Sequence, residues 1–460
     1  MTLIKSISGI RGTIGGKTQD NLTPLDTVLF ASAYASWLKS NVTADHYTVV
    51  VGRDARISGK MVQSLVNETL VGMGIDVIDL GLSTTPTVEM SVVELKAQGG
   101  IIITASHNPK QWNALKLLNN KGEFLNANSG MKILEIAKSK DFNYASVDEL
   151  GKITPVSNAI ESHIEQVLAL SIIQLEKIKK AKFKVVVDAV NSTGGIALPK
   201  LLKELNVEVV ELYCTPDGNF PHNPEPLKEH LGELCNQVLS HKADFGIVVD
   251  PDVDRLAFVD EKGEMFGEEY TLVACADYVL SKKSGNTVSN LSSTRALADI
   301  TSKHRGTYHA SAVGEVNVVE KMKEVNAVIG GEGNGGIIYP ELHYGRDALV
   351  GIAIFLSLLS ENQLKVSELR SSYPAYFMSK AKVNLDLKRD VDGLLIRMKE
   401  NYSKQNPIAI DGVKIEFDNS WVHLRKSNTE PIIRVYTEAP SQVEADDLAK
   451  RFLEEIETNS

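Results

Sequence analysis

The sequence predicts an α/β protein of several domains with a smaller α+β domain at its end. The chain has 460 residues, and at about 150 residues per domain this length suggests roughly three domains. Short apolar runs alternate with longer amphipathic stretches along most of the chain. That alternation is the βαβ pattern of a mostly parallel sheet covered by helices. The end of the chain differs, because short strand-like runs there lie among helical stretches.

Five apolar runs are the expected strands of the α/β part, and each ends in a loop rich in Gly, Asp, Ser or Asn. They cover residues 47–51, 100–103, 183–187, 245–249 and 327–329. Open α/β sheets bind ligands beyond the carboxyl ends of their strands. Loops of this kind, spread over most of the chain, therefore predict several α/β domains that face one cleft.

The C-terminal part has its own set of expected elements. Strands are predicted at residues 383–388, 413–417, 421–425 and 432–437, and helices at residues 392–401 and 441–456. Strands and helices in this order predict a small α+β domain rather than another βαβ unit.

Composition and charge exclude several classes of protein. Hydrophobic residues make up 43% and charged residues 23% of the chain, as in soluble globular proteins. The net charge of −10 disfavours non-specific binding to nucleic acid or to anionic membranes, although a local basic pocket remains possible. The longest nearly apolar run, residues 349–359, is 11 residues long, whereas a membrane helix needs about 20. We expect neither a nucleic-acid nor a membrane partner.

The N-terminus and the cysteines indicate the compartment. The first residues contain no apolar signal-peptide segment. The three cysteines, Cys214, Cys235 and Cys275, form no CxxC pair. This argues against a disulfide framework and against a structural zinc site. A reducing, cytoplasmic location is expected.

The acidic loop at residues 250–255 is the first candidate site. Asp250, Asp252 and Asp254 alternate with other residues, and carboxylates so spaced in a loop can converge on a hard divalent cation. An EF-hand is disfavoured because Arg255 stands where that loop requires Gly, and because strand-like runs flank it. A solvated acidic turn is also disfavoured, since the acids directly follow a buried-looking strand. Mg²⁺ suits a site of few carboxylates and a phosphate.

The loop at residues 104–109 is a candidate nucleophile site. Ser106 follows an expected strand and precedes His107, but neighbours in the chain seldom face each other. The absence of G-x-S-x-G argues against an α/β-hydrolase. From spacing alone, the favoured interpretation is that Ser106 and Asn108 stabilise the next turn.

Two further loops have ligand-binding composition. In residues 331–336, glycines let the backbone approach a ligand, and Glu332 and Asn334 can hydrogen-bond sugar hydroxyls. This loop has neither the P-loop nor the dinucleotide pattern, and taken alone a plain strand-to-loop transition is the slightly favoured interpretation. Residues 425–431, with Arg434 beyond them, can cradle a phosphate or form a polar hairpin turn.

Single residues complete the candidates. Arg11 and Arg53 lie in Gly-containing segments, although lone arginines usually form surface ion pairs. Asp347 is expected to cap the helix that follows it.

Taken together and in this order, the motifs are far more specific than any one of them. The sequence resembles the α-D-phosphohexomutase family, which includes phosphoglucosamine mutase, phosphomannomutase and phosphoglucomutase, over essentially the whole chain. Residues 10–12 open the resemblance, and four loops resemble the phosphoserine, metal, sugar and phosphate-binding loops of the family: residues 104–109, 250–255, 331–335 and 425–431.

The resemblance implies a fold of four domains around a central cleft. The first three are related α/β domains and the last is a smaller α+β domain. The expected ranges are 1–155 with the phosphoserine loop, 156–258 with the metal loop, 259–372 with the sugar loop and 373–460 with the phosphate-binding loop.

The resemblance also implies an activity and its residues. A phosphohexomutase interconverts 6-phospho and 1-phospho hexoses through a phosphoserine and a bisphosphate intermediate, with Mg²⁺ as cofactor. The implied catalytic residues are Ser106 as phosphoryl carrier, Lys116 as general acid or base, Arg11, and His107, which orients the loop. The implied metal ligands are Ser106, Asp250, Asp252 and Asp254. The implied substrate-binding residues are Arg255, Glu332, Asn334, Arg425, Ser427, Asn428, Thr429 and Arg434.

The charges of the reactants explain these residue types. A phosphoserine and a sugar phosphate each carry about −1.5 to −2 at neutral pH. Bringing both into one cleft requires a metal and fixed cations. Cations and a metal around Lys116 are expected to lower its pKa, as a base requires.

Two departures from the family pattern bear on the sugar. Residues 113–116 read Asn-Ala-Leu-Lys instead of Asn-Gly-x-Lys, and Gly336 stands where many members have His. The Asn-Gly-Gly ending of the sugar loop and residues 313–316 resemble the phosphoglucosamine mutase branch. Phosphomannomutase or phosphoglucomutase is the alternative.

Two other classes of function are less favoured. A Ser-dependent metal phosphatase would need no separate phosphate-anchoring loop near the C-terminus. A non-catalytic sugar-phosphate binding protein would need neither Ser106, nor the three aspartates, nor Lys116. The expected partners are a hexose or hexosamine phosphate and its bisphosphate, and the protein is expected to be a monomer or a homodimer.

Overall fold

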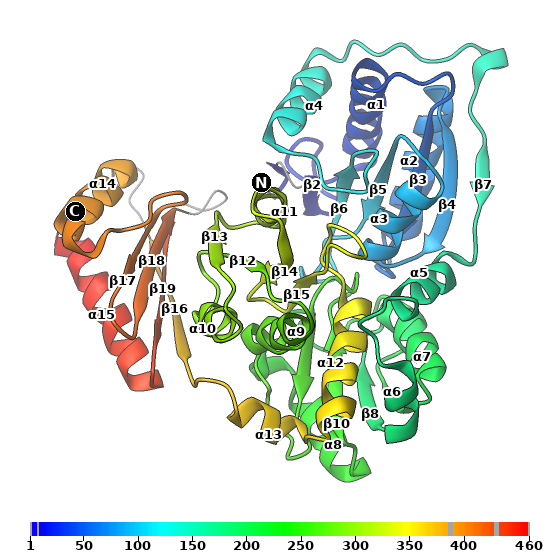
Figure 1. The fold of residues 1–460 in the computed structure, drawn as a ribbon. Coiled ribbons are helices and arrows are strands. Elements are labelled where there is room, and N and C mark those ends of the chain that lie inside the picture. The colour runs from blue at the N-terminus through cyan, green and yellow to red at the C-terminus, as the bar shows by residue number, and fades with distance from the viewer. Residues whose placement is uncertain (1, 7–8, 385–389, 427–431, 459–460) are drawn as a thin grey trace.

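Four β-sheets, each with its own helices, make up the molecule (Figure 1). The computed structural model describes residues 2–6, 9–384, 390–426 and 432–458. Along these residues, the first three sheets belong to α/β units and the fourth to an α+β unit. This is the predicted fold class. Within the described residues no helix is both long and apolar enough to cross a membrane.

The first unit contains a seven-stranded mixed sheet in the order β1-β2-β6-β5-β3-β4-β7. Its strands are β1 (Ile4–Ser6), β2 (Gly9–Thr13), β3 (Thr48–Arg53), β4 (Asp76–Leu82), β5 (Gly99–Ile103), β6 (Trp112–Leu118) and β7 (Ile153–Pro155). Its helices are α1 (Pro24–Asn41), α2 (Gly59–Gly72), α3 (Thr85–Glu94), α4 (Ala127–Ser139) and the 3₁₀ turn η1 (Val147–Glu149). The start of α1 is fixed by a capping box, in which Thr23 and Asp26 satisfy each other's backbone N–H groups.

The second unit has a four-stranded sheet in the order β11-β10-β8-β9. Its elements are α5 (Ala159–Leu168), α6 (Leu175–Ala181), β8 (Lys184–Asp188), α7 (Gly194–Glu204), β9 (Glu208–Leu212), η2 (Lys228–His230), α8 (Gly232–His241), β10 (Phe245–Val249) and β11 (Leu256–Val259). Strand β10 is buried along its whole length, as its continuous apolar sequence requires.

The third unit repeats this arrangement in the order β13-β12-β14-β15. Its elements are α9 (Glu268–Lys282), β12 (Asn286–Asn290), α10 (Ala296–Lys303), β13 (Tyr308–Ser311), α11 (Glu315–Glu324), β14 (Ala327–Glu332), β15 (Gly336–Ile338), α12 (Ala348–Asn362) and α13 (Val366–Ser371). The prediction ended the strand at residue 329. The strand instead continues to Glu332, because Gly330, Gly331 and Glu332 pair with β15.

The three α/β units share one topology. In each, two parallel βα steps lead to a third parallel strand, and a fourth strand returns antiparallel beside it: β3-β4-β5-β6, β8-β9-β10-β11 and β12-β13-β14-β15. The predicted phosphoserine, metal and sugar loops therefore occupy the same position, between the third and fourth strands of each unit. Equivalent loops at the carboxyl ends of three related sheets can face one another across a shared cleft.

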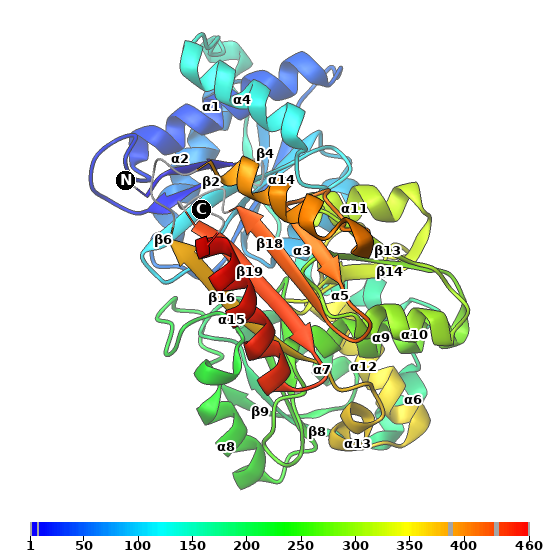
Figure 2. The ribbon, with the colours of Figure 1, turned by 90° about the vertical axis from the view of Figure 1, so that its left-hand side faces the viewer.

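The fourth unit is an antiparallel sheet in the order β16-β19-β18-β17 with two helices on one face (Figure 2). Its elements are β16 (Phe377–Asn384), α14 (Val391–Asn401), η3 (Ser403–Gln405), β17 (Val413–Glu416), β18 (Trp421–Lys426), β19 (Ile432–Ala439) and α15 (Gln442–Thr458). The strand predicted at residues 383–388 begins earlier, at Phe377, because residues 377–382 already pair along β19. Residues 385–388 lie outside the described residues.

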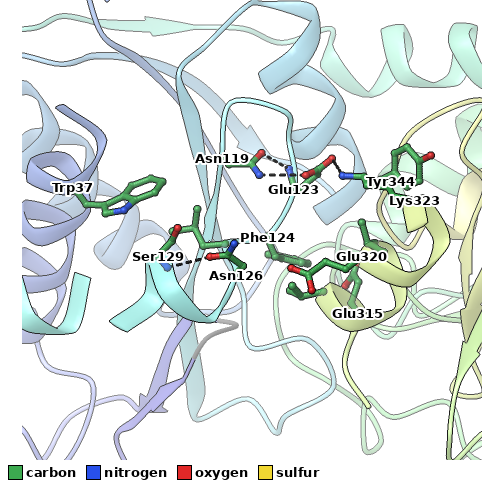
Figure 3. A pocket seen from close by; sticks show the side chains of 13 residues that line it. Trp37, Asn119, Glu123, Phe124, Asn126, Ser129, Glu315, Glu320, Lys323 and Tyr344 are labelled. Atoms are coloured by element: carbon green, nitrogen blue, oxygen red, sulfur yellow. Dashed lines mark hydrogen bonds and ion pairs between the residues drawn. The ribbon is translucent and has the colours of Figure 1, made fainter. Parts of the chain in front are cut away.

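Apolar packing joins the second and third units most extensively. One continuous core runs from Ile160 to Tyr373, and α12 packs against α5, α6 and α9. The first and third units meet around a small pocket of about 150 Å³, where Lys323 of α11 contacts the Tyr344 ring and forms an ion pair with Glu123 (Figure 3). The domain boundaries given in the sequence analysis, after residues 155, 258 and 372, remain predictions.

Candidate active site

All four units line one cavity of about 720 Å³. Arg11, Ser106 and Lys116 come from the first unit, Arg255 from the second, Glu332 and Arg346 from the third, and Asp411 and Arg425 from the fourth. A neighbouring cavity of about 440 Å³ adds Asn334 and Arg434. Eight of the residues in these two lists were predicted from sequence, and the predicted cleft between domains is therefore present.

Ser106 lies just beyond the end of β5 in a left-handed backbone conformation, with φ of +48°. Its backbone N–H donates to Thr104 Oγ1 at 2.9 Å, and its Oγ donates to Asp250 Oδ2 at 2.6 Å. A left-handed conformation costs a non-glycine residue about 1–2 kcal/mol. The surrounding contacts must offset this strain, and they turn the hydroxyl toward the acidic loop.

Arg56 holds the Ser106 loop from behind. Its guanidinium is 1% exposed and donates to the carbonyl oxygens of Ser106, Asn108, Pro109 and Trp112. Asp54 balances its charge at 2.9 Å. A planar group with five donors can fix several carbonyls at once, as lysine cannot. The sequence prediction singled out Arg53 instead, which bonds Gln63 and the Asp54 carbonyl and lines neither cavity.

The three aspartates of the acidic loop converge as predicted. One carboxylate oxygen from each lies within 4.8 Å of the others, and all three residues are fully buried. The loop joins two antiparallel strands, which also removes the EF-hand alternative. Burial and the charges of Asp254 and Asp252 raise the pKa of Asp250 well above its ordinary value.

Two oxygens of this loop have no partner. Asp252 Oδ1 and Asp254 Oδ1 are buried and accept no hydrogen bond from the described residues. A buried, unpaired carboxylate oxygen is costly. Three convergent carboxylates with open oxygens suit a hard divalent cation such as Mg²⁺, so the residues present fit the expected metal.

The surroundings of the Lys116 ammonium group differ from those predicted. Its Nζ lies 2.7 Å from Asp252 Oδ2 and 3.4 Å from Asp254 Oδ2. Burial alone would lower the pKa of Lys116, but these two carboxylates raise it above its ordinary value. The two carboxylates outweigh the nearby cation Arg346, so neighbouring side chains alone do not lower the pKa of Lys116. The predicted lowering also counted a bound metal, and it stays a prediction.

His107, Arg11 and Arg255 line both cavities beside Ser106. His107 Nδ1 lies 3.4 Å from Ser106 Oγ, although the two residues are adjacent in the chain. Burial and the nearby Arg255 hold the pKa of His107 well below its ordinary value. Burial and Arg255 also lower the pKa of Arg11. Two arginines crowded together make a place for an anion.

The sugar loop is tied to the metal loop by Arg346. Its guanidinium lies 2.7 Å from Asp254 Oδ2, 2.7 Å from Glu332 Oε2 and 3.1 Å from Glu315 Oε2. A β-carbon at Gly336 would lie 2.3 Å from Arg346 Cδ. Gly336 therefore leaves the space through which Arg346 passes.

The two residues predicted to bind the sugar, Glu332 and Asn334, differ in how many side chains already hold them. Glu332 is 5% exposed, and its oxygens also accept from Asn290 Nδ2 and the Gly314 N–H. Asn334 faces the smaller cavity, with its Oδ1 accepting from the Gly336 N–H at 3.2 Å.

The fourth unit contributes two arginines on its open sheet face. Arg425 of β18 and Arg434 of β19 are direct cross-strand partners, and they alternate with Leu424 and Val435, which belong to the core under the helices. Like charges directly opposite each other destabilise a strand pair. Asp411 offsets one of them, 2.8 Å from Arg425 Nε. Ser427, Asn428 and Thr429 lie outside the described residues.

Sequence reasoning missed three residues that organise the site: Arg56, Arg346 and Thr85. Thr85, at the start of α3, donates its hydroxyl to Asp252 Oδ2 at 2.6 Å and its N–H to the Asp252 carbonyl. Each acts on a residue far away in the chain, so no local spacing indicated it. Arg346 directly precedes Asp347, whose predicted role as cap of α12 is confirmed by its bonds to the N–H groups of Leu349 and Val350.

Sequence comparison matches most of the chain to four profiles of one family. Residues 3–144, 161–263 and 267–376 match phosphoglucomutase/phosphomannomutase alpha/beta/alpha domains I, II and III, and residues 380–455 match the C-terminal domain. A phosphoglucomutase/phosphomannomutase of Thermococcus kodakarensis is 35% identical, with 94% of this chain and 95% of that protein covered. A probable phosphoglucosamine mutase of Methanopyrus kandleri is 32% identical, with coverage of 97% and 96%.

Solved structures share the fold. The crystal structure of a phosphoglucomutase/phosphomannomutase family protein from Burkholderia thailandensis matches with a TM-score of 0.84 at 25% identity. The match covers 99% of this chain and 98% of the other.

Proposed function

The chain belongs to the phosphoglucomutase/phosphomannomutase family of α-D-phosphohexomutases, and from this premise we propose that it is a phosphoglucosamine mutase that uses Mg²⁺. As a phosphohexomutase it is an isomerase that moves a phosphoryl group within a hexose phosphate. The observation that carries the proposal is the two-ended cavity. Ser106 and the acidic loop lie on one wall, and Arg425 of the fourth unit lies on another.

The two ends suit one sugar that carries two phosphates in turn. Arg425 and Arg434 would anchor the phosphate that does not react, because a phosphate removes the repulsion between two facing cations. The phosphate on Ser106 would meet the sugar hydroxyl at the other end. When the sugar phosphate is anchored, the sugar hydroxyl and the phosphoserine are held close together. This positioning is a main source of the rate enhancement of phosphoryl transfer.

In the forward step the bond between phosphorus and Ser106 Oγ breaks as a bond to the sugar hydroxyl oxygen forms. The leaving Oγ needs a proton, which Lys116 in its protonated form can supply. The sugar hydroxyl loses its proton as its oxygen bonds to phosphorus, and that proton can restore the ammonium group of Lys116. In the return step Oγ attacks the other phosphate of the bisphosphate and loses its proton. The bond between that phosphorus and its sugar oxygen breaks, and the sugar oxygen takes up a proton, so the step as a whole moves one proton from Oγ to the sugar. Asp250 Oδ2 at 2.6 Å and the neutral His107 Nδ1 at 3.4 Å are in position to accept the proton of Oγ.

Asp250, Asp252 and Asp254 would hold the Mg²⁺ together with the phosphoserine. When bound there, Mg²⁺ would neutralise charge on the phosphoryl group. Lys116 and Arg346 already contact this loop, so they would share that task and keep the carboxylates in place.

The identity of the sugar is supported by the glucosamine-type residues 313–316 and by the name of the Methanopyrus relative. The Thermococcus relative favours glucose or mannose as the alternative. Glu332 is fixed by Arg346, Asn290 and the Gly314 N–H, so we assign it to all substrates. Glu320 of α11 is exposed on the cavity wall and forms no ion pair with the described residues. We assign it to the 2-ammonium group of a hexosamine.

A coupled mutase assay on glucosamine, glucose and mannose phosphates tests the choice of sugar. We expect the highest kcat/KM for glucosamine phosphate, with measurable turnover of the others. One ion pair or hydrogen bond more is worth about 1–3 kcal/mol, so the preference should be about 10- to 100-fold. Glu320→Gln should reduce that preference while leaving turnover of glucose phosphate intact. Faster turnover of mannose or glucose phosphate would reject the hexosamine assignment.

Mass measurement tests the carrier. Wild-type protein should bear a labile phosphate that Ser106→Ala removes, with mutase activity falling by orders of magnitude. Wild-type activity in the alanine variant would reject the phosphoserine mechanism for every sugar.

A further inference from the structure

A second cluster of metal-binding side chains lies where the first three units meet. It consists of His163 on α5, and His343 and Asp347 in the segment that leads into α12. None of these residues lines the two cavities of the active site. The cluster is buried, since the side chains of the three residues are 1%, 12% and 0% exposed.

The three side chains point at one place. His163 Nε2 lies 2.9 Å and His343 Nε2 lies 3.3 Å from the same oxygen, Asp347 Oδ2. The three ligand atoms are all within 4.8 Å of one another. Zinc bonds of about 2.0–2.1 Å at tetrahedral angles would place neighbouring ligand atoms about 3.3 Å apart. The side chains thus need little movement to share one ion.

The outer nitrogens of both imidazoles face polar side chains, as in metal-binding histidines; His163 is hydrogen-bonded, and His343 lies at ion-pair distance. His163 Nδ1 lies 2.9 Å from Thr87 Oγ1, and His343 Nδ1 lies 3.4 Å from Glu89 Oε2. A hydroxyl or carboxylate on one ring nitrogen fixes the ring and its tautomer, and the other nitrogen then faces the metal. The second oxygen of Asp347 is already occupied as the cap of α12, so only Oδ2 faces the centre.

A buried carboxylate, that of Glu89, lies beside the cluster without a hydrogen-bond partner among the described residues. Its Oε2 is 3.4 Å from His343 Nδ1, on the side of the ring away from Asp347. Glu89 is 2% exposed, and neither of its oxygens accepts a hydrogen bond from the described residues. When a divalent ion takes the lone pair of His343 Nε2, the Nδ1–H of that ring is left to donate to Glu89.

We propose that His163, His343 and Asp347 bind one divalent ion of the zinc class, with Thr87 and Glu89 orienting the two imidazoles. Two imidazoles and one carboxylate favour zinc over Mg²⁺, and they leave one position for a water molecule. The absence of paired cysteines argued against a structural zinc site, but a site made of His and Asp leaves no cysteine pattern in the sequence.

The site would stabilise the junction behind the catalytic loops. Asp347 directly follows Arg346, which contacts Asp254, and the first turn of α3 connects Thr87 to Thr85, which contacts Asp252. An ion that fixes the three units here would therefore hold two groups that position the acidic loop. Its role is structural, and it takes no part in phosphoryl transfer.

Metal counting tests the proposal on the full chain. The protein is stripped with a chelator, saturated with Mg²⁺ to occupy the acidic loop, and titrated with Zn²⁺ and, separately, with Co²⁺. We expect one Zn²⁺ per chain by elemental analysis, visible Co²⁺ bands of imidazole coordination, and a higher unfolding temperature with Zn²⁺. Asp252→Asn should leave this Zn²⁺ binding unchanged, since it alters only the acidic loop.

Variants separate this site from surface histidines. His163→Asn and His343→Asn should each weaken Zn²⁺ binding by more than 100-fold, and Glu89→Gln by about 10- to 100-fold. His241→Asn, at the end of α8, is the matched control and should change nothing. If a histidine variant does not fold, Glu89→Gln still provides the test. Less than one Zn²⁺ per wild-type chain, or binding that both histidine variants and Glu89→Gln leave intact, would overturn the proposal.

Discussion

Replacing Arg346 with glutamine should destabilise the third unit, because it removes the cation shared by three buried carboxylates. Asp254 would keep Lys116 at 3.4 Å, and Glu332 would keep Asn290 at 2.8 Å. Glu315 would keep only the backbone N–H of residue 346. The structure therefore predicts the cost of about one uncompensated buried carboxylate, about 3–5 kcal/mol, rather than three times that amount.

The cost should depend on pH. Burial already raises the pKa of Glu315, and Arg346 is the main influence that opposes the rise. Without Arg346 the pKa of Glu315 rises further, so the folded state binds a proton that the unfolded state releases. A carboxyl whose folded pKa is raised contributes stability at low pH that is lost as the pH rises toward that folded value. The deficit of the variant should thus shrink on acidification by up to about 1.4 kcal/mol per pH unit.

Urea unfolding at pH 8 and pH 6, followed by circular dichroism, measures both effects. The comparison uses the first transition, since a chain of four units need not unfold in one step. Arg370→Gln is the control, because Arg370 bonds the Phe266 carbonyl and stacks on the Tyr270 ring without an ion pair among the described residues. Arg346→Lys should lie between wild type and Arg346→Gln. If Arg346→Gln matches Arg370→Gln within about 1 kcal/mol at both pH values, the reasoning is refuted.

Three further predictions concern the loops. Asp252→Asn should abolish the Mg²⁺-dependent activity that chelation removes and Mg²⁺ restores in wild type; full, Mg²⁺-saturable activity in this variant would contradict the metal assignment. Arg425→Ala should raise KM for the hexose phosphate about 30-fold, the equivalent of one charge-assisted contact of about 2 kcal/mol, and should increase hydrolysis relative to mutase turnover; an unchanged KM would remove Arg425 from the phosphate site. Gly335→Ala, measured by urea unfolding, should cost about 1–2 kcal/mol for its φ of +85° and about 1–3 kcal/mol more because its β-carbon would lie 2.1 Å from the Leu256 carbonyl oxygen. Gly15→Ala shares the positive φ but meets nothing within 4 Å, so equal losses in the two variants would contradict the predicted clash.

The strands that carry the site were predictable, because burial imposes a strong local pattern. The expected strand at residues 245–249 matches β10, whose five residues are all buried. The predicted strand ends were wrong where hydrogen-bonded pairing with a neighbouring strand, and not a run of apolar residues, extends the strand. β14 continues through two glycines to Glu332, and β16 begins at the half-exposed Phe377.

The need of the acidic loop for a cation could also be predicted from neighbouring residues in the sequence. Three carboxylates in five residues repel one another without a cation, and this follows from spacing alone. The pKa of Lys116 could not be predicted from its neighbours in the sequence. Its pKa depends on Asp252 and Asp254, more than 130 positions away, and sequence reasoning placed cations around it where the fold places anions.

The sequence by itself determined the strands, the loops that follow them and the residue types of the phosphoserine, metal and sugar loops, because each depends on neighbours within a few positions. The sequence also predicted that these loops face one cleft, but only the tertiary structure decided that they occupy the same place in three related sheets. It also decided that Arg56 fixes the Ser106 loop and that Arg346 joins the metal and sugar loops. Ion pairs and hydrogen bonds of this kind join residues from different units. Their energy depends on distance and burial in the folded chain, and neither quantity has a counterpart in local sequence spacing.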